Sequence, residues 1–137
     1  MLFRSALYYL ILAGNKSARD YANSQARKQF EEARELLPLV PHSTEQALEL
    51  WTGLGDVLVF IGEYEEARSC FQEALETYKQ DLSFEGDHDQ SALYRKIAVT
   101  FERQGDFDLA LDQLSCANEV LIDVHNSTPV EIGRAHV

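Results

Sequence analysis

The chain has 137 residues, of which 45% are hydrophobic and 26% charged, with only three prolines and seven glycines. This composition is typical of one globular domain or a short repeat array, and it argues against a β-sandwich or a linker-rich chain. The formal charge of -11, from 23 acidic and 12 basic residues, argues against a nucleic-acid partner, because binding to phosphates needs a basic surface.

The chain opens with an apolar run from Ala6 to Ala13 that follows Arg4, as in a short secretory signal. This run is shorter than the roughly 20 residues that span a membrane. The same residues fit a helix in phase with later repeats, so we favour a helical repeat and expect no membrane partner.

A first helical hairpin is predicted over residues 5–38, where the small and large positions of the middle of the chain recur. Tyr21 stands where a turn glycine is expected. Pro38 and Pro41 are expected to end the second helix, because proline cannot continue one. The aligned pairs are Gly14 with Gly55, Ala26 with Ala67, and Phe30 with Phe71.

The middle of the chain has the clearest pattern, two apolar stripes at helical spacing separated by a glycine. A glycine just past a periodic run suits the left-handed residue that ends a helix. We therefore predict a second hairpin over residues 44–79, with Ser43 or Thr44 as its N-cap. The positions that define it are Trp51, Leu54, Gly55, Gly62, Tyr64, Ala67, Phe71 and Ala74.

The pattern returns in a third hairpin predicted over residues 89–122, when Gly105 is aligned with Gly62. Leu10, Trp51 and Tyr94 then mark a period of 41 and 43 residues. Such a period is typical of a helical solenoid. The defining positions of this copy are Tyr94, Gly105, Ala110 and Ala117.

The connection over residues 79–90, KQDLSFEGDHDQ, is rich in acidic residues. Its order lacks the ligand spacing of a calcium loop, and His88 has no second histidine or cysteine at ligand spacing. We expect a solvated loop without metal. Cys70 and Cys116 lie isolated in apolar stripes, which favours buried free thiols in a reducing compartment, the cytoplasm.

The tail over residues 125–137 is predicted to be unstructured. Residues 131–137, EIGRAHV, have no periodicity and resemble translated sequencing adapter, so we expect them not to be native sequence. The predicted repeat domain is therefore residues 5–124, as a fragment of a longer array whose further hairpins cover the last helix.

The order W-x2-L-G-x2-L-x3-G-x-Y-x2-A-x3-F-x2-A from Trp51 to Ala74 resembles the tetratricopeptide repeat. The segment from Tyr94 to Ala117 is similar to it, with Ala98 for the second glycine. The period exceeds the family's usual length of about 34 residues. The resemblance covers residues 5–122 and implies an all-α, right-handed α-solenoid of three antiparallel hairpins that acts as a protein-binding scaffold.

A second resemblance suggests an alternative. Residues 6–38 are similar to the start of the repeat region in large bacterial signalling ATPases, some of them fused to nucleotide cyclases, which implies a regulatory or sensor segment. The chain has no phosphate-binding loop, so no nucleotide cofactor is assigned. A self-contained enzyme is the third reading; we assign no catalytic residues, because the histidines and paired carboxylates fall in loops and on polar faces.

The tetratricopeptide resemblance implies a concave groove lined by the first helix of each hairpin. Phe60 and Tyr8 are the best candidate anchors for a protein or peptide partner, since aromatic side chains dominate interface hot spots. The basic set that grips a terminal carboxylate in some relatives is absent, and Asp56 would repel one. The candidate groove residues are Tyr8, Ile11, Asn15, Arg19, Glu49, Thr52, Asp56, Phe60, Arg95, Val99, Glu102 and Arg103.

Overall fold

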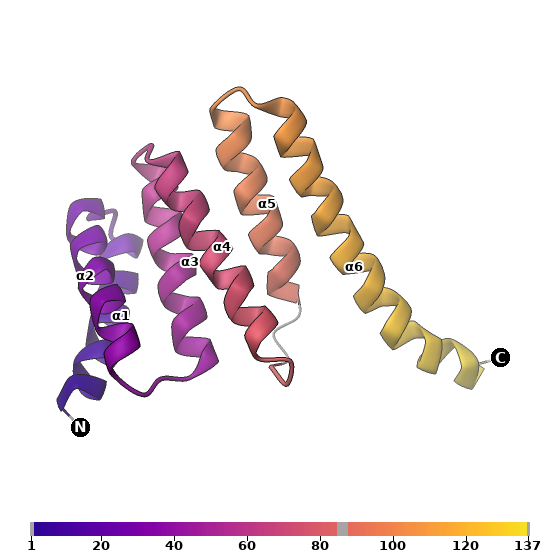
Figure 1. The fold of residues 1–137 in the computed structure, drawn as a ribbon, viewed down its shortest axis with the longest axis horizontal. Coiled ribbons are helices and arrows are strands. Elements are labelled where there is room, and N and C mark those ends of the chain that lie inside the picture. Colours follow the sequence, from indigo (N-terminus) through magenta and orange to yellow (C-terminus); the bar gives the residue numbers. More distant parts are fainter. Residues whose placement is uncertain (1, 85–87, 137) are drawn as a thin grey trace. The chain divides into compact units, whose positions relative to one another are not determined.

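The computed structural model describes the backbone of residues 2–84 and 88–136 and the side chains of residues 5–84 and 90–123. Across these residues the chain is helical and has no β-strand, and it forms two compact units, residues 1–82 and 83–137 (Figure 1). The elements are α1 (Leu2–Arg19), α2 (Asn23–Leu36), the short 3-10 helix η1 (Leu37–Leu39), α3 (Thr44–Phe60), α4 (Tyr64–Gln80), α5 (His88–Arg103) and α6 (Phe107–His136).

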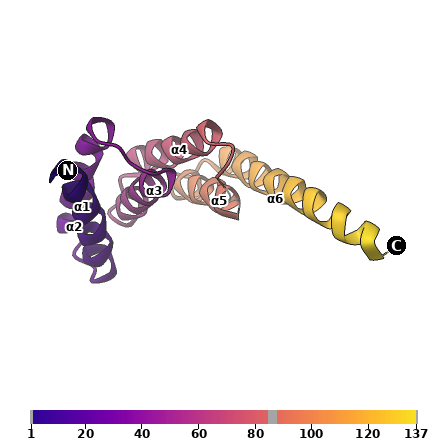
Figure 2. The ribbon, with the colours of Figure 1, turned by 90° about the horizontal axis from the view of Figure 1, so that it is seen from below.

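The first unit contains two antiparallel hairpins, α1 with α2 and α3 with α4, as both views show (Figures 1 and 2). The hairpins stack because α2 packs against α3, and α1 also contacts α3. An ion pair between Arg27 of α2 and Glu66 of α4, 3.3 Å apart, joins the two second helices at the surface. The second unit is the single hairpin of α5 and α6, in which buried Ser91 donates a hydrogen bond of 3.2 Å to the carbonyl of Ala117.

All three hairpins turn through the same backbone motif. The residue at the bend has positive φ in each: 61° at Tyr21, 89° at Gly62 and 83° at Gly105. In each, the next residue's N–H donates to the carbonyl five residues back, the bond that closes a Schellman motif. Tyr21 therefore occupies a turn-glycine position, and the three predicted bends are equivalent. The bonds are Ala22 to Ser17 (2.8 Å), Glu63 to Leu58 (2.8 Å) and Asp106 to Phe101 (2.9 Å).

The first unit is held together by phenylalanine rings seated against glycines. A Cβ added at Gly14 of α1 would lie 2.7 Å from the Phe30 ring, and one at Gly53 of α3 would lie 2.6 Å from it. The ring of Phe30, from α2, is therefore clamped between two helices. Gly55 and Phe71 repeat this contact inside the second hairpin. Gly14 and Gly55, two small positions identified in the sequence, thus contact the large positions Phe30 and Phe71, whereas Gly53 was not identified there.

Most of the defining repeat positions belong to the core, because a close helix contact requires small residues beside large ones. Trp51, Tyr64 and Tyr94 are half-buried rather than fully enclosed. The buried positions are Leu54, Gly55, Ala67, Phe71, Ala74, Ala98, Ala110 and Ala117.

The start of α3 carries the predicted cap. The hydroxyl of Ser43 accepts from the N–H of Gln46 at 3.0 Å, and the side-chain oxygen of Gln46 accepts from the N–H of Ser43 at 3.0 Å. This capping box satisfies two backbone donors that a helix start otherwise leaves unpaired. At the other end of the connection, α2 ends at Leu36 and Pro38 lies in η1, as the prolines predicted.

Two stretches differ from the sequence-based expectation. The connection between the second and third hairpins is shorter than residues 79–90, since α4 runs to Gln80 and α5 begins at His88. Residues 85–87 and the side chains of His88 and Asp89 lie outside the described residues. The backbone of residues 125–136, expected to be unstructured, continues α6 to His136. A helix that has already formed gains a hydrogen bond for each residue it adds, so it needs no apolar periodicity to continue.

Candidate functional site

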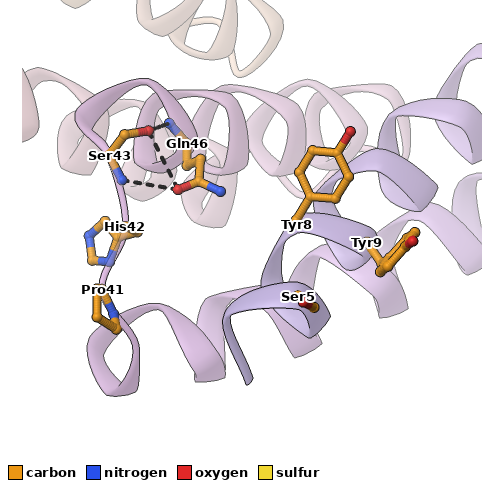
Figure 3. Close-up of a pocket in the computed structure, with 7 residues that line it drawn as sticks. All are labelled: Ser5, Tyr8, Tyr9, Pro41, His42, Ser43 and Gln46. Atoms are coloured by element: carbon orange, nitrogen blue, oxygen red, sulfur yellow. Dashed lines mark hydrogen bonds between the residues drawn. The ribbon is translucent and has the colours of Figure 1, made fainter. Parts of the chain in front are cut away.

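A groove lies between α1 and α3 in the first unit. One hollow of about 50 Å³ is lined by Tyr8, Ile11, Leu12 and Asn15 of α1 and by Gln46 and Glu49 of α3. A wider hollow of about 670 Å³ is lined by Ser5, Tyr8, Tyr9, Pro41, His42, Ser43 and Gln46 (Figure 3). Because the hollows share Tyr8 and Gln46, they form one continuous surface, which we call the α1–α3 groove.

Tyr8 is the central aromatic side chain of the α1–α3 groove. It is 55% exposed, and its ring packs edge-on against Tyr9 with centroids 5.6 Å apart. Figure 3 shows Tyr8 standing between Gln46 and Tyr9. A large, rigid and exposed aromatic ring beside polar groups has the character of an interface anchor.

A second aromatic pair lies at the turn end of the same two helices. The rings of Tyr21, just after α1, and Phe60, the last residue of α3, have centroids 6.3 Å apart. Both side chains are mostly exposed. Tyr21 is thus held in a left-handed conformation that disfavours a bulky residue, while its ring contacts the neighbouring hairpin.

The α3 wall of the groove is acidic. Helix α3 contains Glu45, Glu49 and Asp56 and no lysine or arginine. Partial burial raises the pKa of the Glu49 carboxyl above its usual value, and the nearby charge of Glu45 raises it further. Both effects disfavour the negative charge of Glu49, so a cation placed beside it would relieve the repulsion.

The structure brings together three of the predicted groove residues, Tyr8, Asn15 and Glu49, in the smaller hollow. Ile11 also lines it but is 3% exposed, so it forms a floor rather than a free contact. Thr52 is half-buried and Asp56 exposed on α3, and Arg19 is exposed at the end of α1. Phe60 is exposed at the end of α3. The last four, Arg95, Val99, Glu102 and Arg103, are exposed on α5 in the second unit.

Seven groove residues were missed from the sequence: Ser5, Tyr9, Leu12, Pro41, His42, Ser43 and Gln46. Leu12 is four residues after Tyr8, and Gln46 is three residues before Glu49. Each therefore lies one helical turn from a predicted residue, and the helical period would have identified it. Ser5 also lies on the Tyr8 face of α1 by that period. The helical period could not have found Tyr9, Pro41, His42 and Ser43, because the wider hollow depends on where the loop before α3 passes α1.

A separate hollow of about 530 Å³ lies among α2, η1, α3 and α4, and Trp51 lines it. Its charged lining is mixed in sign, since it includes Arg34, Glu73 and Asp81. The hydroxyl of Thr44 donates to the Asp81 carboxylate and ties the start of α3 to the end of α4. We attribute the half-burial of Trp51 to this opening.

The described residues contain no group of three or more histidine, cysteine or acidic side chains that could hold a metal ion. Cys70 is a buried free thiol, as expected, whereas Cys116 is only half-buried. In the described part of the chain, no helix combines the length and the apolar character that crossing a bilayer requires.

Comparisons with known proteins relate the chain to one repeat family. The sequence profile described as tetratricopeptide repeat matches residues 46–121, more than half of the chain. The TPR domain of Arabidopsis FLU is similar in structure, with a TM-score of 0.77 and 21% sequence identity, over 88% of this chain and 98% of that one. The N-terminal domain of stress-induced protein-1 from C. elegans has a TM-score of 0.71 and 14% identity, over 88% of this chain and 87% of that one. Curated protein sequences gave no significant match.

At these low sequence identities, the structural similarity establishes the fold alone. The predicted fold class, an all-α solenoid of helical hairpins, is confirmed.

Proposed function

Because the chain belongs to the tetratricopeptide repeat family, whose domains mediate protein–protein interaction and are typically non-catalytic, we propose that it binds a partner protein in the α1–α3 groove. The observation that carries the proposal is the continuity of two hollows around an exposed Tyr8. A repeat protein uses such surfaces to hold an extended segment or a helix of its partner.

The proposed contact has an apolar part and a polar part. Tyr8 and Leu12 offer exposed apolar surface over a floor formed by Ile11. Asn15, Gln46 and Glu49 offer side-chain hydrogen-bonding groups along the same hollow. An extended peptide needs both parts. Its alternate side chains enter the apolar part, and its backbone amides form hydrogen bonds with the polar part.

The test selects binding peptides from a display library against the full chain and then measures their affinity by fluorescence anisotropy. We expect Tyr8→Ala to weaken the selected peptides by about tenfold or more, since removing an anchor typically costs more than 1 kcal/mol. The matched control is Phe107→Ala, which removes a similarly exposed aromatic ring from α6, outside the groove. Equal losses in the two variants, or peptides insensitive to Tyr8→Ala, would refute the groove as the binding site.

A further inference from the structure

We infer that the segment bound in the α1–α3 groove is cationic: an extended peptide with an apolar side chain against Tyr8 and a neighbouring lysine or arginine beside Glu49. This inference rests on the proposed function and names the chemistry of its partner. It draws on the hollow that contains Tyr8 and Glu49 together and on the charge of the wall formed by α3.

Charge complementarity favours a cation at this position. Glu49 lines the hollow, and Glu45 lies one turn earlier on the same helix, where its charge acts on Glu49. A partner carboxylate would add a third negative charge to a site that a bound peptide partly screens from water. A partner ammonium or guanidinium group would instead be attracted, and attraction strengthens as water is excluded.

The basic side chains that the structure describes on the groove helices are Lys16 and Arg19, both in the last turn of α1. Lys16 of α1 pairs with Asp20 at 3.8 Å, one turn along the same helix. Arg19 stands at the last position of α1, toward the turn. Glu49 lines the smaller hollow together with Tyr8 and Leu12, whose apolar surface is exposed.

The length of α3 sets a spacing between the cation contact at Glu49 and the aromatic pair of Tyr21 and Phe60. Glu49 and Phe60 are eleven residues apart on α3, or about 16 Å at the rise of an α-helix. An extended peptide covers this length in about five residues. An apolar side chain about five residues from the lysine or arginine beside Glu49 would therefore reach the pair formed by Tyr21 and Phe60.

The experiment compares three labelled peptides with equal length and identical leucine positions, which carry lysine, glutamine or glutamate at the same remaining positions. Binding to the full chain is measured by fluorescence anisotropy at low and at physiological salt. We expect the lysine peptide to bind most tightly and the glutamate peptide most weakly, with the difference shrinking as salt screens the charges.

Two charge reversals separate a local effect from the overall charge of -11. Glu49→Lys should weaken the lysine peptide roughly three- to tenfold and leave the glutamine peptide within about twofold. Glu76→Lys makes the same change of charge on an exposed position of α4 and should change all three affinities by less than about twofold. Glu49→Gln, which keeps the size of the side chain, should give a smaller loss in the same direction.

The outcomes distinguish this inference from the proposed function. If Tyr8→Ala weakens all three peptides while Glu49→Lys is no more selective than Glu76→Lys, the groove binds peptides but the inference is wrong. A glutamate peptide that binds as tightly as the lysine peptide would also overturn it. If no peptide responds to Tyr8→Ala, both the inference and the proposed function fail.

Discussion

The first two hairpins and the third follow one sequence pattern but differ in how far equivalent residues are buried. Phe30 and Phe71 have no exposed surface, whereas Leu114 at the same position of the third hairpin is 40% exposed. Phe30 is enclosed because Gly14 of its own hairpin and Gly53 of the next both approach its ring. In the second unit α6 packs against α5, and several apolar residues of α6 remain in contact with water. These are Phe107, Leu109, Leu111, Leu114, Leu121 and Ile122.

This difference shows that the burial of a residue at a repeat position depends on the helices packed around it. The small-residue sites on the second helices, Ala26, Ala67 and Ala110, are buried in all three hairpins because they face their own first helix. Positions that face outward from a hairpin depend on the next one. The predictions below test this distinction.

The largest effect is expected for Phe30→Ala, which should lower the free energy of unfolding by about 3–5 kcal/mol, because it empties a site enclosed from two sides. Leu114→Ala should cost about 1 kcal/mol, as expected for a side chain that is partly in water. Denaturant unfolding followed by circular dichroism measures both. Similar losses would mean that the two positions are equally enclosed.

A smaller effect is expected from filling the glycine sites on either side of Phe30. Gly14→Ala and Gly53→Ala should each destabilise the chain by about 1–3 kcal/mol, because the ring cannot retreat from one helix without approaching the other. The double variant should lose more than the two single losses combined. The measurement is denaturant unfolding of the parent, the two single variants and the double variant. Additive losses of unfolding free energy would show that the Phe30 ring has room to move.

The buried thiol of Cys70 should make the stability of the chain depend on alkaline pH. Burial raises the pKa of the Cys70 thiol from 9.0 to about 11, with nearby acidic residues adding to the rise and Arg34 opposing it. The folded chain therefore keeps this proton at a pH where the unfolded chain releases it. This contribution to stability is complete below about pH 9 and is lost as pH rises to about 11, by roughly 1–3 kcal/mol.

The measurement for this titration is the unfolding free energy as a function of pH. Cys70→Ala should remove the part of the alkaline loss that the thiol causes, whereas the matched variant Cys116→Ala should retain it. A parent chain and a Cys70→Ala variant with parallel pH profiles would argue that the thiol is in contact with water.

The smallest effect concerns the turns. Gly105→Ala should cost about 1 kcal/mol, since an L-residue is strained at its φ of 83°. Tyr21 already bears this strain, but its ring contacts Phe60. The change in the free energy of unfolding caused by Tyr21→Gly should therefore be more favourable in a Phe60→Ala variant than in the parent chain. The expected difference is about 0.5–1.5 kcal/mol, the usual contribution of an aromatic pair. A double-mutant cycle that gives zero coupling would show that the two rings do not interact energetically.

Much of the fold could be predicted because helix pairing is a local property. Two apolar stripes separated by Gly62 leave few arrangements other than a hairpin, and Ser43 caps α3 through a residue three positions away. The candidate groove was only partly predictable. Tyr8 and Glu49 follow from the helical period, whereas Tyr9 and His42 enter the groove through the path of the loop before α3.

What the sequence by itself determined is the set of bends and contacts inside each hairpin, including the position of Tyr21 at a turn that elsewhere uses glycine. Helical periodicity and turn chemistry act over a few residues, so they can be read along the chain. Only the tertiary structure decided that Phe30 is clamped by Gly53 and that Tyr8 and Glu49 share one hollow. These depend on how one hairpin approaches the next, because the surface that each side chain buries belongs to residues far away in the sequence.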